Sequence, residues 1–344
     1  MKKGCPYGTH RVLEPEGTLP QPAWKIDNTM EIYDNEILID VQTLNIDSAS
    51  FTQIEQEAEG DVEKIKAKMK EIIGDRGKHH NPVTGSGGML IGTIAKIGDK
   101  LQDRDLKVGD RIATLVSLSL TPLKIDNIKE VRPEIDQADV KGQAILFESG
   151  IYAKLPEDMS ETLALAVLDV AGAPAQTAKL VEPGDTVFII GAGGKSGMLC
   201  LHEARKRAGV TGTVIGMGHS DSSCNRIKEL GLADIVLQGD ATKPVEVLEM
   251  VKESLGGNQA DITINCVNIP DTEMASILPT KDDGTIYFFS MATSFTKAAL
   301  GAEGVGKDTE MIIGNGYTKG HADIALNTLR ENPKLKDIFE ELYA

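Results

Sequence analysis

The chain has 344 residues, a formal net charge of −16 at pH 7 and 41% hydrophobic residues. This acidic balance has the wrong sign for a nucleic-acid binder, and no apolar run reaches the about 20 residues that a membrane-spanning helix needs. The four cysteines form no C-x-x-C pair, so neither a disulfide framework nor a zinc ribbon is indicated. The length predicts two domains, and the N-terminus "MKKGCPYGTH" has no signal-like apolar segment, which predicts a cytoplasmic protein.

The first part of the chain is predicted to be rich in short strands. Residues 31–47, "EIYDNEILIDVQTLNID", show the partial alternation of a half-buried strand. At about 55–75 the composition becomes charged, and apolar residues recur at helical spacing, which predicts an inserted amphipathic helix. "GSGGMLIGTIAKIGDK" and "LKVGDRIATLVSLSL" then return to short apolar runs with Gly-Asp turns, as in a compact barrel.

The second part of the chain alternates strands and helices. The apolar runs "TVFII", "GTVIGM", "DIVLQ", "DITINCV" and "GTIYFFS" are separated by segments with helical patterns, and the chain closes with the helical "HADIALNTLRENPKLKDIFEELYA". Such alternation predicts a parallel sheet with helices on both faces.

A glycine cluster, "GAGGKSG", follows the first of these strands. A P-loop is excluded, because the glycine it needs five residues before Gly194 is replaced by Ile189 inside the strand. The cluster resembles a dinucleotide turn that is one residue longer than G-x-G-x-x-G; a merely structural turn is the alternative. The expected cofactor residues here are Gly191, Gly193, Gly194, Lys195, Ser196 and Gly197, with Lys195 either at the pyrophosphate or in solvent.

The end of the next strand bears on the choice between NADP and NAD. An NAD enzyme is expected to carry an acidic residue there, but the position falls near Gly218, followed by His219 and Ser220, with Arg226 on the next helix. These residues favour NADP, although the nearby Asp221 leaves NAD open. Further cofactor contacts are expected where two later strands end, at Cys266, Val267, Asn268, Ser290, Met291 and Ala292.

Several segments together resemble the medium-chain dehydrogenase/reductase superfamily. They include "EILIDVQTLNIDSASF", "NPVTGSGGMLIG", "LKVGDRIATL" and "LALAVLDVAGAPAQTAKLVEPGDTVFIIGAGGKSG". The resemblance implies an α/β chain with a GroES-like β-barrel domain at 1–155, a Rossmann NAD(P)-binding domain at 156–310 and a closing segment at 311–344. It also implies a homodimer, since such domains pair through sheet edges.

Other segments resemble a branch of this superfamily that oxidises an amine in lysine fermentation. They are "VNIPDTEMASIL" and "FFSMATSFTKAALGAEGVGKDTEMIIGNGY". The resemblance implies NAD(P)-dependent oxidative deamination of a small diamino acid, L-erythro-3,5-diaminohexanoate, to L-5-amino-3-oxohexanoate and ammonia. A zinc-free quinone or enone reductase and a non-catalytic nucleotide-binding sensor are the alternatives.

The residues that would hold catalytic zinc in the superfamily are replaced here. The ligand cysteine and histidine would align near Asp47 and Ser86, and the remaining cysteine near 167–170, where none occurs. Zinc prefers about four nitrogen or sulfur ligands, so no catalytic metal is expected. The adjacent His79 and His80 are more typical of a surface loop.

Amine oxidation without a metal needs a base, carboxylates for ammonium groups and donors that orient substrate or water. The candidates fall in four parts of the chain. Asp47 and Ser48 follow a strand of the first domain. The alternative to a catalytic role for Asp47 is that of a carboxylate in the turn at the end of this strand. Asp169 interrupts the apolar run "ALAVLDVAGA", which favours an interior role, with pairing to a lysine as the alternative. His79 or His80 would be a base titrating near neutral pH, and Ser86 would orient substrate unless it only shapes its turn. Asn315 to Tyr317 are expected near the active site from the resemblance.

Overall fold

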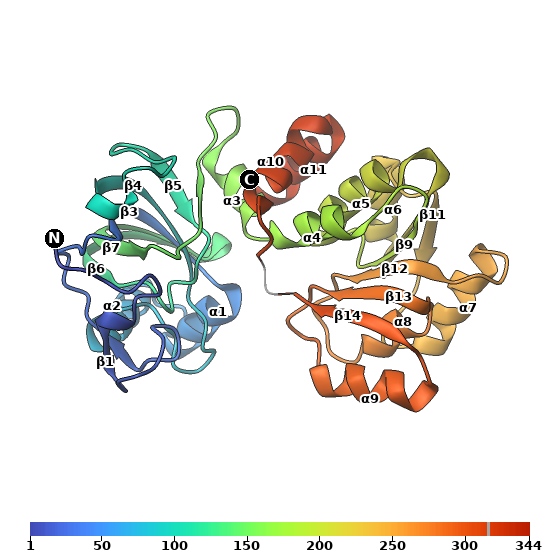
Figure 1. Ribbon diagram of the computed structural model, residues 1–344, viewed down its shortest axis with the longest axis horizontal. Helices are drawn as coiled ribbons and strands as arrows, with labels where there is room; N and C mark the ends of the chain where they lie inside the picture. The colour runs from blue at the N-terminus through green and yellow to red at the C-terminus, as the bar shows by residue number, and fades with distance from the viewer. Residues whose placement is uncertain (315–316) are drawn as a thin grey trace. The chain divides into compact units, whose positions relative to one another are not determined.

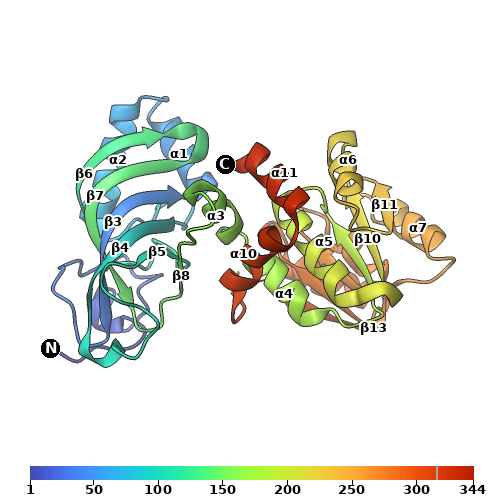
Figure 2. The same ribbon diagram turned by 90° about the horizontal axis from the view of Figure 1, so that it is seen from above.

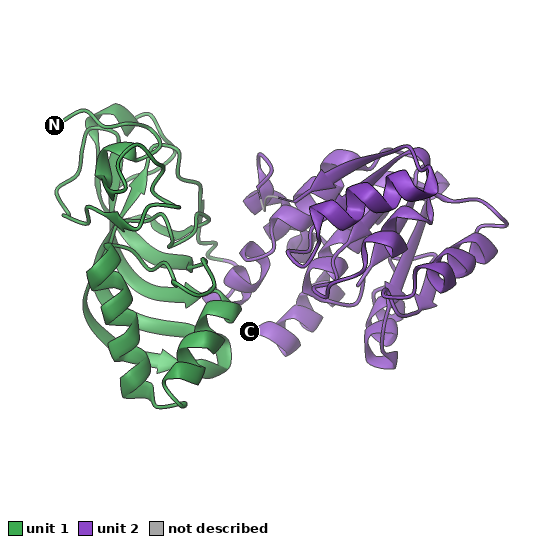
Figure 3. Cartoon of the chain, turned by 90° about the horizontal axis from the view of Figure 1, so that it is seen from below, with its two compact units in different colours: residues 1–157 green, residues 158–344 purple. Residues whose placement is uncertain are grey.

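The computed structural model describes residues 1–314 and 317–344, so Asn315 lies outside the described residues. The chain divides into two compact units, residues 1–157 and 158–344 (Figure 3). The segment predicted to be a separate closing part, 311–344, belongs to the second unit.

Unit 1 is built on an antiparallel sheet in the order β6-β7-β3-β4-β5-β8. Its strands are β3 (Glu36–Ile46), β4 (Gly88–Ile97), β5 (Arg111–Thr114), β6 (Leu123–Arg132), β7 (Gln137–Phe147) and β8 (Tyr152–Lys154). β1 (Val12–Glu14) and β2 (Lys25–Ile26) form a separate pair. Along β3, Ile37, Ile39 and Val41 are buried while Asp40 and Gln42 are exposed, so the predicted alternation is present.

The predicted helical insertion consists of two helices between β3 and β4. They are α1 (Ser48–Glu57) and α2 (Val62–Arg76), joined by a short turn. α2 begins after the capping carboxylate of Asp61 and ends at Gly77, whose φ of 73° is left-handed. Its face of Ile65, Met69 and Ile72 is buried in the core of unit 1, whereas Val62 is exposed. Short 3-10 turns complete the unit at Thr9–Arg11, Asp99–Leu101 and Pro133–Ile135.

Unit 2 is built on a six-stranded sheet in which every neighbouring pair is parallel, in the order β11-β10-β9-β12-β13-β14. Its strands are β9 (Thr186–Ile190), β10 (Thr213–Gly218), β11 (Ile235–Gln238), β12 (Ala260–Asn265), β13 (Thr280–Phe288) and β14 (Thr309–Ile313). The order reverses between β9 and β12, as in dinucleotide-binding sheets, and the crevice at this switch point lies beyond the carboxyl ends of the strands.

Helices cover both faces of this sheet (Figure 1). They are α3 (Glu161–Leu168), α4 (Gly172–Leu180), α5 (Lys195–Ala208), α6 (Asp221–Leu230), α7 (Pro244–Ser254), α8 (Glu273–Ile277), α9 (Phe295–Val305), α10 (His321–Glu331) and α11 (Pro333–Tyr343), with a 3-10 turn at Gly209–Thr211. α10 packs against α4 and α5, and α11 packs against α10 and α3 (Figure 2). The predicted fold class is confirmed: an α/β chain with a Rossmann-type parallel sheet and an antiparallel sheet. None of the helices in the described part is long and apolar enough to span a bilayer.

Candidate functional site

The register of two strands in unit 1 brings Asp47 and Ser86 together, although they are 39 residues apart. β3 ends at Ile46 opposite Gly88, the first residue of β4, so the residues just beyond these ends are neighbours. Ser86 Oγ donates a hydrogen bond of 3.1 Å to Asp47 Oδ1. Asp47 is also the N-cap of α1, where its carboxylate accepts from the backbone N–H of Ala49. Two predicted site residues therefore share one hydrogen bond.

Ser86 belongs to a cluster of three hydroxyl groups. Ser50 Oγ lies 2.5 Å from both Ser86 Oγ and Thr84 Oγ1, and Thr84 Oγ1 lies 3.2 Å from Ser86 Oγ. Ser50 is fully buried, whereas Asp47 and Thr84 are exposed. Because each hydroxyl both donates and accepts, the three hydroxyl groups form a continuous hydrogen-bonded chain that ends at the Asp47 carboxylate. We refer to Asp47, Ser50, Thr84 and Ser86 as the hydroxyl–carboxylate cluster.

The loop that carries Thr84 and Ser86 is shaped by the buried Asn81. Its side-chain oxygen accepts from the backbone N–H groups of Val83 at 2.8 Å and Thr84 at 3.2 Å, and its amide donates to Gln53 Oε1 at 2.8 Å. The sequence prediction missed Ser50, Asn81 and Thr84. The Asn-Pro pair in "HHNPVTGSGG" is the signal that identifies Asn81, since asparagine side chains commonly bond the backbone two residues further on.

Ser48 is placed differently from its neighbour. Its hydroxyl donates to the Asp136 carboxylate, at the turn between β6 and β7. No hydrogen bond among the described residues joins Ser48 to the hydroxyl–carboxylate cluster.

The expectation of surface histidines titrating near neutral pH is wrong. His79 is fully buried and His80 is half-buried. Burial lowers the pKa of His79 to about 4, although the carbonyls of His79 and Gly87 partly oppose this. Burial, Lys78 and Arg76 likewise lower the pKa of His80 to about 4. Both imidazoles are therefore neutral at pH 7, and His80 lies beside the cluster's loop, since a Cβ on Gly85 would be 3.9 Å from His80 Nε2.

A buried lysine, also missed from the sequence, precedes the histidines. Lys78 Nζ donates to the carbonyls of Pro20 at 2.6 Å and Gln21 at 2.8 Å. Burial, with a smaller contribution from the positive charge of Arg76, lowers the pKa of Lys78 to about 7. Its two carbonyl partners indicate that Lys78 fixes the N-terminal segment of unit 1.

In unit 2, the glycine turn forms the connection from β9 to α5. Gly191 has a left-handed φ of 79°, and a Cβ on Gly197 would approach Gly191 O to 2.2 Å. A Cβ on Gly193 would meet Ser223 O of α6 at 2.4 Å, whereas one on Gly194 would find nothing closer than 3.4 Å. Gly194 is the N-cap of α5 and supplies no side-chain cap, so the first backbone N–H groups of the helix are available to a phosphate. The turn thus fits the pyrophosphate of a dinucleotide.

The side chain of Asp169 is not buried as expected. It is exposed at the end of α3, and its Oδ2 lies 2.7 Å from Lys195 Nζ at the start of α5. Asp169 is therefore paired with a lysine, which is the alternative that the sequence analysis gave. Ser196, the other polar residue of the turn, is half-buried.

The end of β10 has no room for the acidic residue of an NAD site. A Cβ on Gly218 would meet Ser223 Oγ at 2.4 Å and Cys224 Sγ at 2.9 Å, because α6 begins directly against this strand. The Ser220 side chain caps α6, and His219 is exposed. Asp221 accepts from Gln238 Nε2 at 3.0 Å, and Arg226 Nε donates to Gly193 O at 2.9 Å. Arg226 is therefore anchored to the glycine turn itself.

The other predicted cofactor residues follow β12 and β13, which are paired in parallel up to Asn265 and Phe288. The N–H groups of Phe289 and Ser290 both bond to Asn265 O, which holds the two strand ends together. Asn268 and Met291 are exposed, while Ser290 is buried and accepts from the Ala292 N–H. Cys266 Sγ lies 3.8 Å from Cys200 Sγ, and this neighbour together with burial raises the pKa of the Cys266 thiol. Val267 packs against Gly191.

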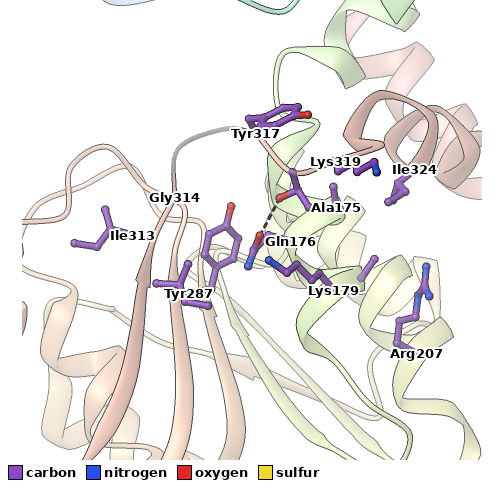
Figure 4. A pocket seen from close by; sticks show the side chains of 13 residues that line it. Ala175, Gln176, Lys179, Arg207, Tyr287, Ile313, Gly314, Tyr317, Lys319 and Ile324 are labelled. Atoms are coloured by element: carbon purple, nitrogen blue, oxygen red, sulfur yellow. Dashed lines mark hydrogen bonds between the residues drawn. The ribbon is translucent and has the colours of Figure 1, made fainter. Parts of the chain in front are cut away.

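A cavity of about 690 Å³ lies in unit 2 beside α4, β13, β14 and the start of α10 (Figure 4). Its wall includes the cations Lys179, Arg207 and Lys319, and none of the described residues that line it carries a carboxylate. Thr318 Oγ1 bonds to Gln176 Oε1 at 2.8 Å across the cavity. Tyr317, predicted to lie near the active site, is one of the lining residues.

One group of potential metal ligands occurs among the described residues: His202, Glu203 and Glu331. Lys206 Nζ lies 2.7 Å from Glu331, and Arg207 Nε lies 3.3 Å from Glu203, so cations already neutralise both carboxylates. This arrangement is an ion-pair network between α5 and α10. The expected absence of catalytic zinc stays a prediction.

Comparison with known proteins identifies the family. Residues 10–156 match the profile of the L-erythro-3,5-diaminohexanoate dehydrogenase N-terminal domain. The chain is 67% identical over 342 residues to the L-erythro-3,5-diaminohexanoate dehydrogenase of Acetoanaerobium sticklandii, with 99% of each chain covered. It is 64% identical over 344 residues to the enzyme of the same name from Fusobacterium nucleatum, with 100% of each covered. The chain belongs to the L-erythro-3,5-diaminohexanoate dehydrogenase family. It is therefore an oxidoreductase, as predicted.

Solved structures place this family in the medium-chain dehydrogenase/reductase fold. CurK enoyl reductase superposes with a TM-score of 0.54 at 16% identity, covering 96% of this chain and 85% of that one. The quinone oxidoreductase of Escherichia coli, complexed with NADPH, gives a TM-score of 0.51 at 16% identity, covering 90% and 81%. At this identity the likeness concerns the fold. The dehydrogenase family and the glycine turn support a nicotinamide cofactor.

Proposed function

We propose that the protein oxidatively deaminates L-erythro-3,5-diaminohexanoate to L-5-amino-3-oxohexanoate, using NADP or NAD. The observation that carries this proposal is the 67% identity, over 99% of both chains, to a protein named for that substrate. In the balanced reaction, the substrate ammonium, water and the oxidised cofactor give the ketone, NH4+, the reduced cofactor and a proton.

The glycine turn and the N-terminus of α5 would hold the cofactor's pyrophosphate, while residues after β12 and β13 would border its nicotinamide half. A nicotinamide held there would supply the hydride acceptor for oxidation at the carbon that bears the amino group. Every other requirement falls to side chains: binding the two ammonium groups, taking up a proton and guiding water.

The hydroxyl–carboxylate cluster of unit 1 is our proposed acid–base group. The exposed Asp47 carboxylate can accept hydrogen bonds from a substrate ammonium, and the Ser86 hydroxyl that already donates to it can exchange a proton with Ser50. His80 is neutral at pH 7 because its pKa is lowered to about 4, and the same low pKa makes it a weak base, so we assign it to hydrogen bonding beside the cluster's loop rather than to proton uptake. His79 is fully buried and is assigned to packing.

NADP is the proposed cofactor. Gly218 leaves no space for a carboxylate that would repel the additional phosphate, and Asp221 is engaged by Gln238. Arg226, fixed to the glycine turn, supplies a cation on the side of β10 where the ribose of the adenosine half binds. We expect a higher kcat/KM with NADP than with NAD; a strong preference for NAD would overturn this assignment.

The function is tested with purified protein, L-erythro-3,5-diaminohexanoate and each cofactor. We expect reduced nicotinamide, followed by absorbance, and ammonia, measured enzymatically, to appear in equal amounts. Reduction of a quinone without amine oxidation would identify a reductase instead. Cofactor binding without either reaction would identify a sensor.

We also propose a homodimer. β14 is the last strand of its sheet, so the outer edge of its backbone is free to pair with a second copy. Light scattering coupled to gel filtration is expected to give twice the chain mass; a monomer at all concentrations would contradict this. The cytoplasmic location also stays a prediction.

A further inference from the structure

The last helix of the chain ends beside the glycine turn. α11 is capped by the Asn332 side chain, which accepts from the Leu335 N–H at 3.1 Å. Leu335 and Phe339 are fully buried and fix the helix against unit 2. The ring of Tyr343, one turn after Phe339, contacts it edge-on with centroids 5.1 Å apart. A fixed helix thus determines where the half-buried Tyr343 ring lies.

Two cations attached to the glycine turn lie near this ring. Lys195 Nζ, in the first residue of α5, is 5.7 Å from the ring centroid and is held there by Asp169 Oδ2 at 2.7 Å. Arg226, whose Nε donates to Gly193 O, lies close enough for its charge to oppose the rise that burial causes in the pKa of the Tyr343 phenol. α5 and α11 therefore meet through Lys195 and Tyr343, and Arg226 of α6 is bonded to the glycine turn that precedes Lys195.

An aromatic face with cations beside it is suited to an adenine nucleotide. Adenine stacks on aromatic rings, and lysine and arginine bind the phosphates that are attached to its ribose. Arg226 lies on the helix that follows β10, which is the side of the sheet where the adenosine half of a dinucleotide binds; the nicotinamide half lies toward β12 and β13. The placement of Tyr343 relative to Arg226 therefore distinguishes the two halves of the cofactor.

We propose that Tyr343 is a cofactor-binding residue that contacts the adenosine half of the dinucleotide, beside Lys195 and the glycine turn. This inference rests on the proposed function only in that the glycine turn binds a nicotinamide dinucleotide. It makes α11 part of the cofactor site, although this helix is far from the glycine turn in sequence.

The test is a calorimetric titration with NADPH and with ADP, which carries only the adenosine half. Tyr343→Ala is expected to weaken the binding of both by about 10-fold, as the loss of one base–aromatic stack does. Tyr343→Phe, which keeps the ring, should stay within about 2-fold of the unaltered protein. Leu342→Ala is the matched control, because Leu342 precedes Tyr343 on the same helix and is 43% exposed. A thermal unfolding scan of each variant shows whether α11 has kept its place.

Three results would overturn the assignment. Unchanged affinity of Tyr343→Ala for both ligands would remove Tyr343 from the site. Weaker NADPH binding with unchanged ADP binding would place the contact at the nicotinamide half. Tighter binding of both ligands would mean that the ring obstructs the site. The titration needs no turnover, so its result does not depend on the proposed reaction. A protein that binds NADPH but fails to oxidise the diamino acid would refute the proposed function. The affinities of the Tyr343 variants for NADPH and ADP would still decide this inference.

Discussion

The glycine turn of unit 2 and the hydroxyl–carboxylate cluster of unit 1 are built in opposite ways. The turn works through backbone groups and depends on side chains being absent, since a Cβ on Gly193 or Gly197 would meet backbone oxygens at 2.4 Å and 2.2 Å. The cluster works through side chains from two segments that meet only because β3 and β4 pair in one register. A local motif therefore defines the first site, whereas tertiary structure defines the second. Changes in the turn should affect cofactor binding, and changes in the cluster should affect chemistry.

The largest effect is expected from Gly193→Val. The added side chain must displace Ser223 and move the turn, so the affinity for NADPH should fall by about 100-fold or more. Calorimetric titration measures this. Gly194→Ala is the matched control on the same turn, because its Cβ would find nothing closer than 3.4 Å; equal losses in the two variants would contradict the steric argument.

Asp47→Asn is expected to lower kcat/KM for the diamino acid by about 10- to 100-fold, because it removes the charge from the hydrogen bonds that the carboxylate makes to an ammonium group. Asparagine is as good an N-cap as aspartate, so α1 should be preserved. Initial-rate kinetics and an NADPH titration should show turnover or substrate binding damaged and cofactor affinity kept. Unchanged kinetics would remove Asp47 from the site.

The free energy of unfolding should depend on pH more strongly for unit 1, which contains the cluster, than for unit 2. The pKa of buried His79 is lowered from 6.5 to about 4, so the unfolded chain binds more protons between these values, and the free energy of unfolding should fall on the order of 3 kcal/mol as pH drops through this range. Fluorescence of the single tryptophan, Trp24 in unit 1, reports urea unfolding at pH 7 and pH 4.

A His79→Asn variant should flatten this dependence. The matched control is His219→Asn in unit 2, where the side chain is exposed, and it should leave the pH dependence as it is. Equal pH dependence in the unaltered protein and in His79→Asn would show that the charge change of His79 does not limit stability.

The smallest effect is expected from Asp169→Asn. It frees Lys195 at the turn, so NADPH should bind about 2- to 5-fold more tightly at low salt, with kcat almost unchanged. Asp271→Asn, which frees Lys297 of another exposed ion pair in unit 2, is the control. A large fall in kcat would return Asp169 to the catalytic residues that the sequence predicted.

Much of unit 2 was predictable because its signals are local. Each strand is a short apolar run, and the glycine turn directly follows the first of them. The spacing of these signals therefore predicts the order of the elements and the edge of the sheet at which a cofactor would bind. Asp169 was the exception. Its apolar surroundings in sequence suggested burial, but it stands at the end of α3, where a helix terminus turns it outward to Lys195.

The site in unit 1 was predictable only in part. Asp47 and Ser86 were identified at the ends of strands, but their contact depends on a register that the sequence does not specify. Ser50 lies before the predicted helical insertion and carries no signal in the sequence; only its hydrogen bonds to Thr84 and Ser86 in the folded chain identify it. His79 and His80 were misjudged because adjacent polar residues are typical of surfaces, and only the packed fold buries them.

The bond from Arg226 to Gly193, with Ser223 packed against the same glycine, has a consequence for redesigning cofactor preference. Substitutions on α6 intended to favour NAD would also move the backbone that receives the pyrophosphate, so selectivity and overall affinity cannot be tuned independently. A successful redesign has to vary α6 and the turn as one unit, with compensating changes at both.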